Sequence, residues 1–510
     1  MGLLIGFQSM LAPYPLFLIC LGTLMGIICG AIPGFTVTLG VVLALPFTFG
    51  MDPATGLALM IGVFIGGFSG GLISGVLLGI PGTPASICTV FDGHPMAKNG
   101  EPGRALGLGV IASFFGTVIS ALVLTTVGPV VAKQSLKFGP WEITALVIFA
   151  LTLIASLSDK STIKGLIAGC MGLLLATVGI DPFGKLRFNF DFDPLATGFS
   201  MLTVLIGLFA FSQLLKSFEE LKKRQESGET IDYKLIKIPY RTLIKDVKNQ
   251  WVNILRSSLI GTFVGALPAA GGDVANFVSY DQAKKMSKNP QKFGTGIPDG
   301  IVAAECANNG TAGGAFIPTI ALGIPGDMPQ AVMMGALILH GITPGPLLFQ
   351  QQPKLVYGIY AACFIAAFFI LFWQFFFVRL FFWISRTPQE HLAPVVLMLC
   401  SVGVFALDNR MYDIWVLWVF GIVGYLLDKA EVPLAPIILG FILGPKVEIE
   451  FIRAWQLSPS LTPFFTRPIA AILLAAAVVS VIVSYYQIYR LRKSETRFQQ
   501  TDPEGVTEEL

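Results

Sequence analysis

Long apolar segments recur along this chain, and many approach the length of a membrane-crossing helix. They include Leu16–Cys29, Ala54–Leu78, Ala105–Val127, Ile143–Leu157, Met201–Leu215, Tyr357–Ile384, Trp415–Leu427 and Ile469–Tyr485. Because a helix needs about 20 apolar residues to cross a bilayer, the chain has room for roughly ten to twelve membrane elements, some of them broken. We therefore predict an all-α polytopic membrane protein.

Glycine and proline interrupt two of these apolar segments in nearly the same way. Leu78–Pro84 reads LGIPGTP, and Leu322–Pro329 reads LGIPGDMP. A helix within a membrane tolerates such a break only where other groups satisfy the backbone that it releases. A single break is explained as well by a kink as by a site. Matched breaks in two halves of a hydrophobic chain are typical of a transporter binding site.

The opening of the chain also recurs in its middle. GAIPG at Gly30–Gly34 resembles GALPA at Gly265–Ala269, and Gly70-Gly71 precedes the first GIPG much as Gly313-Gly314 precedes the second. Internal duplication into two repeats explains both likenesses. The predicted hairpin tips contain Pro33, Gly34, Thr36, Pro268, Gly271 and Gly272.

The charges predict how the two repeats are oriented. Residues 216–256 hold ten Lys and Arg against six Asp and Glu, so this segment is expected in the cytoplasm. A basic loop follows the first GIPG (Lys98, Arg104) but precedes the second (Lys284 to Lys292). This complementary pattern predicts repeats of inverted topology.

The spacing of the basic residues also predicts a re-entrant element. Only about 27 residues separate Arg256 from Lys284, whereas two crossings need roughly 40. Residues 257–280 are therefore predicted to form a re-entrant hairpin. The predicted organisation is a first repeat at 1–215, a connecting loop at 216–256, a second repeat with an extra span at 257–485, and a cytoplasmic tail at 486–510.

Composition narrows the function. The chain is 54% hydrophobic and only 13% charged, whereas soluble domains are about 25% charged. Its net charge of +3 does not suggest nucleic acid as a partner. The seven cysteines show no CxxC spacing, so no zinc site or disulfide framework is indicated. No ATP-binding P-loop, Ser/His arrangement or HExxH motif occurs, so we expect neither an enzyme nor a cofactor.

Broken helices expose backbone N–H groups with partial positive charge, which bind anions without a buried arginine. Hydroxyl and amide side chains near the two breaks would add hydrogen bonds. The predicted substrate-binding residues are Pro81, Gly82, Thr83, Ser86, Asn308, Asn309, Thr311, Gly313, Gly314, Pro325, Gly326 and Asp327.

Three acidic residues in apolar surroundings could serve ion coupling. Asp273, Glu305 and Asp327 could each take part in cation or proton coupling, or could cap a helix N-terminus. Both interpretations stay open. Oxygen atoms near Asn309, Thr311 and Asp273 would also suit a Na⁺ ion.

At these motifs the chain resembles the large membrane subunit of tripartite tricarboxylate transporters, the TctA family. The resemblance is strongest at Gly79–Gly107 and Phe293–Leu348, and Gly265–Tyr280 matches a third family stretch. The glycine-proline pattern of the family maps onto Pro81, Gly82, Asn308, Asn309, Gly313, Gly314, Pro325 and Gly326. The chain departs from the family at Ala269, where Pro-Gly is typical, and at Asp327–Pro329, where small residues are common.

The resemblance implies a carrier in the bacterial inner membrane that imports carboxylates such as citrate, driven by a Na⁺ or H⁺ gradient. It also implies two partners, a small four-span membrane subunit and a periplasmic solute-binding protein. An ion-coupled carboxylate carrier without a periplasmic receptor is the alternative. The sequence leaves open which acid is carried and which ion drives transport.

Overall fold

The computed structural model describes residues 2–156, 161–181, 183–221, 237–268, 270–384 and 389–501. Contacts divide the chain into two compact units, each made of two stretches. Unit 1 is Met1–Lys137 with Ser200–Tyr425, and unit 2 is Phe138–Phe199 with Leu426–Leu510. The boundaries predicted from sequence follow the internal repeat instead and remain a prediction. Ala269, residues 222–236 of the predicted connecting loop and residues 502–510 of the tail lie outside the described residues.

The first half of unit 1 runs from the N-terminus through two long helices. Its elements are α1 (Gly2–Met10), α2 (Pro13–Ala31), α3 (Val37–Ala44), η1 (Leu45–Thr48), α4 (Pro53–Leu78), η2 (Pro84–Ser86), α5 (Ile87–Lys98) and α6 (Pro102–Ser135). The second stretch of unit 1 begins with α9 (Met201–Leu205), the π-helix η4 (Ile206–Phe211) and α10 (Ser212–Leu221).

The later part of unit 1 repeats this order. It contains α11 (Tyr240–Asn249), α12 (Trp251–Gly265), α13 (Gly271–Met286), η7 (Pro290–Lys292), α14 (Pro298–Leu322), α15 (Met328–Leu339), α16 (Leu348–Gln351), α17 (Pro353–Ile384) and α18 (Gln389–Asp408). Helix α19 (Met411–Lys429) begins in unit 1 and ends in unit 2. In both halves, a helical hairpin precedes one long helix, a glycine-proline turn, a shorter helix and a second long helix.

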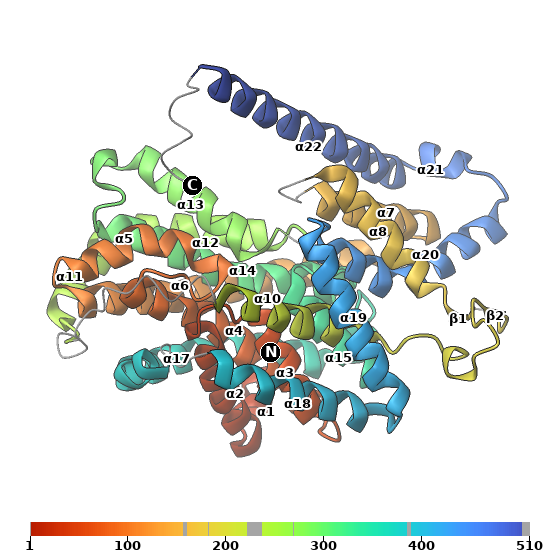
Figure 1. The fold of residues 1–510 in the computed structure, drawn as a ribbon, viewed down its shortest axis with the longest axis horizontal. Helices are drawn as coiled ribbons and strands as arrows, with labels where there is room; N and C mark the ends of the chain where they lie inside the picture. The colour runs from red at the N-terminus through yellow and green to blue at the C-terminus, as the bar shows by residue number, and fades with distance from the viewer. Residues whose placement is uncertain are drawn as a thin grey trace. The chain divides into compact units, whose positions relative to one another are not determined.

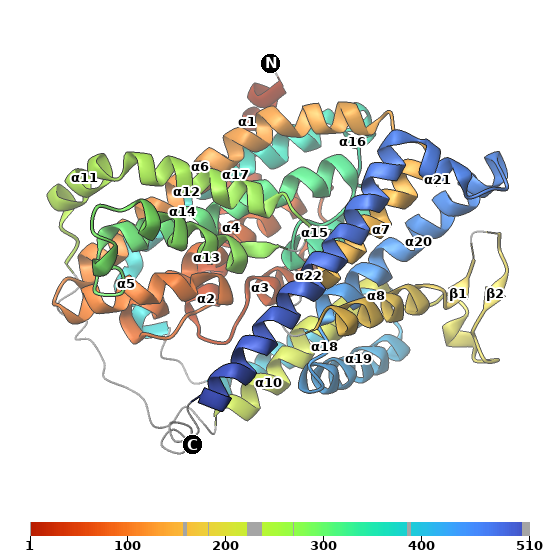
Figure 2. The same cartoon turned by 90° about the horizontal axis from the view of Figure 1, so that it is seen from above.

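Unit 2 is a helical layer with one small hairpin. It contains α7 (Pro140–Ser156), α8 (Thr162–Ala176), β1 (Gly179–Ile180), β2 (Leu186–Arg187), η3 (Asp193–Leu195), α20 (Leu434–Leu457), α21 (Thr462–Thr466) and α22 (Pro468–Thr501). Helix α20 packs on α8 and α22 on α7 (Figure 2). Strands β1 and β2 are antiparallel, with Gly179 opposite Arg187. The predicted tail is therefore helical as far as Thr501.

The all-α class is confirmed, with β1 and β2 as its small exception in the described residues. Six of the described helices are long and apolar enough to cross a membrane, namely Pro13–Ala31, Pro53–Leu78, Pro102–Ser135, Pro353–Phe381, Met411–Lys429 and Pro468–Tyr486. Several shorter apolar helices accompany them, including Met328–Leu339. The chain therefore has the make-up of a multi-pass membrane protein.

Glycine allows close helix packing in both halves of unit 1. A methyl group at Gly22, Gly26 or Gly30 of α2 would overlap backbone oxygens of α4. A methyl group at Gly261 of α12 would likewise overlap the Ala307 carbonyl oxygen of α14. Small residues at such spacing bring helix backbones into contact, as in membrane proteins. The same packing therefore holds the hairpin of each half against its long helix.

Helices of each half pack against helices of the other half. The long helix α14 of the second half packs on α6 of the first, and α4 of the first half packs on α17 of the second. Helix α3 likewise packs on α15, and α13 packs on η2 and α5. Helices α6 and α12 consequently pack on the buried helix α14 in unit 1 (Figure 1). The two glycine-proline turns are thus each covered by the hairpin of the other half.

Candidate functional site

Both long helices that precede a GIPG turn end at a left-handed glycine. Helix α4 ends at Gly79 with φ of 70°, and α14 ends at Gly323 with φ of 67°. Glycine adopts this conformation without the steric cost that a Cβ atom brings, which makes it the usual residue after a helix C-terminus. The two sequence copies therefore form two copies of one backbone turn.

Each turn then starts a new helical segment with a different capping residue. At the first turn, the Thr83 N–H donates to Ser86 Oγ (3.3 Å), and that hydroxyl donates back to the Thr83 carbonyl (2.8 Å). At the second turn, Oδ1 of Asp327 accepts the backbone N–H of Gln330 (2.9 Å) and caps α15. A neutral hydroxyl residue and an acid therefore occupy corresponding positions.

The turns are also tied to the helices before them. The Gly82 N–H donates to the Gly71 carbonyl (3.3 Å), and the Gly326 N–H donates to Thr319 Oγ1 (3.2 Å). A Cβ at Gly82 would lie 2.6 Å from Ser74 Oγ and would overlap the Gly30 carbonyl oxygen. Glycine is required here because backbone approaches backbone.

The N-terminal half of α13 packs beside the first GIPG turn, and its Asp273 lies within electrostatic range of the second. The amide Nδ2 of Asn276 donates to the Ala85 carbonyl beside the first turn. The carboxylate of Asp273 interacts electrostatically with that of Asp327 at the second turn. A Cβ at Gly272 would lie 2.8 Å from Ala85 Cβ and 3.0 Å from Asn308 Oδ1. The second hairpin tip therefore lies near both turns, and together they are the candidate site in unit 1.

Asn308 and Asn309 are adjacent in sequence but have different hydrogen-bond partners. Nδ2 of Asn308 donates to the Phe68 carbonyl of α4 (3.0 Å), which leaves Oδ1 beside Gly272. Nδ2 of Asn309 faces Glu305 (3.5 Å to Oε2), and its Oδ1 accepts from Thr117 of α6 (3.5 Å). Successive residues on a helix point about 100° apart. Asn308 therefore faces α4 and the start of α13, whereas Asn309 faces α6.

Glu305 is the centre of a second polar cluster, one helical turn away from Asn308. It is fully buried, and its carboxylate accepts from Thr89 Oγ1 (2.5 Å) on α5 and Ser113 Oγ (2.9 Å) on α6. These donors are neutral hydroxyls, which stabilise a buried carboxylate without cancelling its charge. The cluster joins three helices, α5, α6 and α14, through one acidic side chain.

Several buried polar atoms around the turns have no hydrogen-bond partner within the described part of the chain. They are Thr83 Oγ1, Asn276 Oδ1, Asn308 Oδ1, Asp327 Oδ2 and both amide atoms of Gln330. Buried polar groups are normally paired, because leaving one unpaired costs about 1–3 kcal/mol. These atoms are therefore available to a bound molecule, and a substrate site at this place is a proposal.

The remaining predicted residues have local roles. Thr36 Oγ1 accepts the Leu39 N–H (3.1 Å) and caps α3, and the Gly34 carbonyl accepts from Gln213 (3.2 Å). Pro33, Pro81 and Pro325 lie in the turns, and Pro268 is buried at the second hairpin tip, where Gly271 has φ of 64°.

Three other predicted residues bond away from the turns. Thr311 donates to the Asn308 carbonyl within α14 (2.6 Å). The Gly313 N–H donates to Ser120 of α6 (3.3 Å), whereas Gly314 packs against the Thr262 backbone of α12. Asn309, Thr311 and Asp273 thus have different neighbours. No group of three His, Cys, Asp or Glu suited to a metal is found in the residues that the structure describes, and a Na⁺ site there remains a proposal.

Sequence reasoning missed the remote partners of the site. Asn276 lies in the quoted third stretch, and Gln330 lies one helical turn after Asp327, yet neither was singled out. Thr89 and Ser113, which hold Glu305, belong to segments distant in sequence. A polar residue within an apolar helix was the available signal for each of them.

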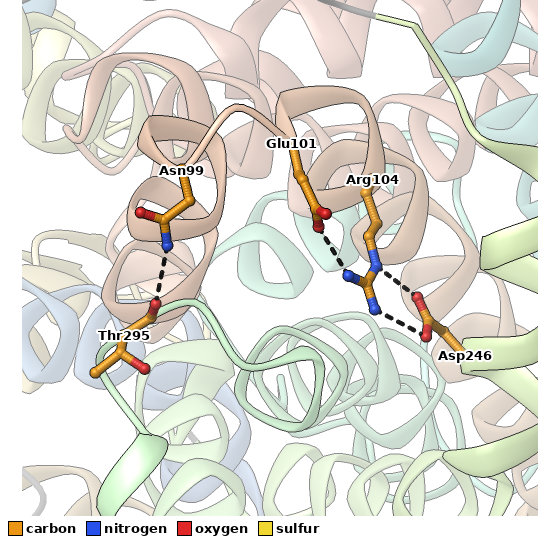
Figure 3. A network of polar contacts seen from close by, with 5 residues as sticks. All are labelled: Asn99, Glu101, Arg104, Asp246 and Thr295. Carbon is orange, nitrogen blue, oxygen red and sulfur yellow. Dashed lines mark hydrogen bonds and ion pairs between the residues drawn. The ribbon is translucent and has the colours of Figure 1, made fainter.

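Loops from both halves meet at one end of unit 1. Arg104 donates to Asp246 through Nε (2.8 Å) and Nη2 (3.0 Å) and to Glu101 (2.7 Å), and Asn99 donates to the Thr295 carbonyl (3.4 Å) (Figure 3). The loop after α5 therefore contacts the loop before α14, and the first turn of α6 contacts α11. The three predicted basic segments contribute to this one end.

The other end of unit 1 shows the complementary pairing. A Cβ at Gly56, near the start of α4, would lie 3.1 Å from Thr48 Cβ and 3.5 Å from Nε2 of His340, which follows α15. Helix α4 therefore begins beside the end of α15, just as α14 begins beside the end of α5. In both cases, the start of the long helix in one half lies beside the end of the shorter helix in the other half.

Fold and site together define a multi-pass helical membrane protein whose two halves each contribute one broken-helix turn to a shared polar centre. Residues 16–439 match the model of the tripartite tricarboxylate transporter TctA family, and the chain belongs to this family. It is accordingly a membrane transporter component.

Two relatives come from Agrobacterium vitis. An uncharacterized 52.8 kDa protein in the TAR-I ttuC' 3' region is 32% identical over 506 residues, covering 97% of this chain and 98% of the relative. An uncharacterized protein in the TAR-II ttuC' 3' region is 37% identical over 236 residues, covering 46% of this chain and 98% of the relative. No solved structure matches the chain.

Proposed function

We propose that this chain is the permease subunit of a binding-protein-dependent secondary transporter that imports carboxylates across the bacterial inner membrane. A periplasmic solute-binding protein would deliver the substrate, and a small four-span membrane subunit would complete the carrier. Tri- and dicarboxylates such as citrate are the substrate class, and a Na⁺ or H⁺ gradient supplies the energy.

The observation that carries the proposal is the position of the N-terminal half of α13, which packs beside the first GIPG turn and holds Asp273 within electrostatic range of Asp327 at the second. Asn276 bonds beside the first turn, and Asp273 interacts with Asp327 at the second. Helix starts at these turns provide backbone N–H groups toward an anion. Buried polar atoms at this centre, such as Thr83 Oγ1 and Asn308 Oδ1, lack partners in the described chain. A substrate carboxylate can accept from Thr83 Oγ1 and from backbone N–H groups, whereas Asn308 Oδ1 only accepts and needs a donor elsewhere on the substrate.

The contacts between the start of a long helix in one half and the end of a shorter helix in the other support repeats of inverted topology. The loop after the first GIPG contacts the loop before the second through Asn99 and Thr295, while Gly56 of α4 lies near His340. Parallel repeats would bring equivalent ends together instead. Inverted repeats can exchange roles as the carrier opens first to one side and then to the other. Alternating access would then follow from the symmetry of the two halves.

The Glu305 cluster is the best candidate for coupling to the ion gradient. Its carboxylate is fully buried and is held by Thr89 and Ser113, while Asn309 lies between Glu305 and Thr117. Because Glu305 lies one turn from Asn308 on α14, a change of its charge would be felt at the substrate site. Carboxylates buried at membrane depth commonly serve ion or proton pathways.

The test is uptake of labelled citrate and other carboxylates in cells that contain the chain and its small subunit, with and without the binding protein. Uptake that requires all three components supports the proposal. Uptake independent of the binding protein would favour the alternative, an ion-coupled carboxylate carrier without a receptor. Absence of carboxylate uptake in the complete system would refute both.

A further inference from the structure

The two turns differ in charge, although their backbones match. The first has the neutral hydroxyl residue Thr83, whose backbone N–H donates to Ser86 Oγ, whereas the second carries the carboxylate of Asp327, whose Oδ1 already accepts the N–H of Gln330. The Asp273 carboxylate, in the first turn of α13, repels that of Asp327. A substrate carboxylate is therefore poorly suited to the second turn and is better accommodated at the neutral first turn.

The second turn nevertheless has unused hydrogen-bonding capacity. Asp327 Oδ2 and both amide atoms of Gln330 are without partners in the described residues, and the two side chains are 7% and 0% exposed. Gln330 lies in the first turn of α15, and because helical side chains lean toward the helix N-terminus, its amide is expected near the turn that Asp327 caps. The second turn thus offers one carboxylate acceptor and one amide that can donate and accept.

Two neighbouring asparagine side chains add further hydrogen-bond acceptors. Asn276 and Asn308 each use Nδ2 to bond a backbone carbonyl, that of Ala85 and of Phe68. Because a carbonyl only accepts, these bonds fix which end of each amide is the oxygen. Both side chains therefore keep Oδ1 for another molecule.

We propose that Asp327 and Gln330 form a hydroxyl-binding subsite, so that the carrier selects hydroxy acids over the corresponding acids without a hydroxyl group. This rests on the proposed function as a carboxylate carrier. A hydroxyl both donates and accepts, so it can donate to Asp327 Oδ2 and accept from Gln330 Nε2. A metal ion or an ammonium group would satisfy the acceptors but would repel the Gln330 N–H.

Malate and succinate test the inference, because they differ by a single hydroxyl group. Binding is measured by thermal stabilisation of the purified chain, which removes the selectivity of the binding protein, and uptake is measured in the complete system. The wild type should prefer malate by at least about tenfold, since a site that pairs with a hydroxyl rejects the analogue lacking it. Asp327→Thr, which copies the first turn, and Gln330→Met should each bring the preference close to one while succinate still binds.

Gln374→Met is the matched control. Gln374 is also a buried amide, and its Nε2 bonds Ser69 Oγ (2.8 Å) between α17 and α4 rather than at the turns. This variant should keep the preference for malate. The amount of each variant in the membrane and its melting temperature without ligand separate a folding defect from a change of selectivity, and either of the two site variants suffices for the test.

An unchanged preference in Asp327→Thr and Gln330→Met would overturn the subsite. Loss of Na⁺ dependence with an unchanged preference would also overturn it and would assign Asp327 to a cation. A wild type that carries succinate as readily as malate refutes the inference but leaves the carboxylate carrier intact. A wild type that carries no carboxylate defeats the proposed function, and the subsite falls with it.

Discussion

The hydroxyl of Tyr280 donates to Oδ2 of Asp92 over 2.7 Å, and this bond joins the two halves of unit 1. Oδ1 of the same carboxylate accepts three backbone N–H groups, from Gly294 (2.9 Å), Gly296 (2.9 Å) and Ile297 (3.0 Å). Asp92 is completely buried, so this one acid from the helix after the first GIPG fixes the loop that leads into α14. The sequence stretches around Asp92 and Gly294 are thus partners.

Replacing Asp92 by alanine should destabilise the protein strongly. The change leaves three backbone N–H groups and the Tyr280 hydroxyl without their acceptor, at about 1–3 kcal/mol for each donor that stays buried and unpaired. We expect a lower melting temperature of the purified protein in detergent and less protein in the membrane. Asn99→Ala, which removes one 3.4 Å bond at the exposed surface, is the control. An unaltered melting temperature in Asp92→Ala would show that water or another group replaces the carboxylate.

Alanine at the close helix contacts should also be costly. A methyl group at Gly26 would overlap the Val63 carbonyl oxygen, and one at Gly261 would overlap that of Ala307. Forcing these backbones apart is expected to cost about 1–3 kcal/mol in the free energy of unfolding. Gly169→Ala is a suitable control, because its nearest new contact is the Pro436 side chain at 3.9 Å. Equal unfolding temperatures for all three variants would contradict the packing described for α2, α4, α12 and α14.

Glu305→Gln should separate transport from its coupling to the ion gradient. Glutamine keeps the shape of the side chain and can still bond Thr89 and Ser113, whose hydroxyls can turn to donate or accept. The variant lacks the charge, so we expect gradient-driven accumulation to fall by more than about tenfold. Exchange of substrate at equal concentrations on both sides, measured with labelled substrate in proteoliposomes, should persist.

The exposed Glu101→Gln is the control for the Glu305 experiment, because Glu101 pairs with Arg104 at the surface. It should accumulate substrate as the wild type does. If Glu305→Gln accumulates substrate normally, coupling must reside elsewhere, and Asp273 and Asp327 become the next carboxylates to test.

Inverted topology predicts opposite labelling of two engineered cysteines. Lys284→Cys should react with a membrane-impermeant maleimide from the cytoplasm, and His340→Cys should react from the periplasm. Both are made in a background without the seven native cysteines, and intact cells are compared with inverted vesicles. Reaction of the two positions from the same side would exclude the inverted arrangement. Labelling of residue 284 from outside the cell would also exclude the re-entrant hairpin at 257–280.

The sequence alone determined the features that depend on local backbone geometry. Gly79 and Gly323 end their helices in the left-handed conformation because glycine has no Cβ, and the prolines that follow cannot continue a helix. The apolar segments likewise determined the helical membrane class, because a membrane element must satisfy its backbone internally. These rules act within a few residues, so a single chain without relatives suffices to apply them.

Only the tertiary structure decided which polar residues share a surface. Asn308 and Asn309 look equivalent in sequence, but the rotation of about 100° between successive residues of α14 directs one to the Phe68 carbonyl of α4 and the other to Thr117 of α6. Asn276 and Thr89 bond residues far away in the chain, because helices of each half pack against helices of the other. Hydrogen bonds across helices depend on packing, and packing is set by the whole chain at once.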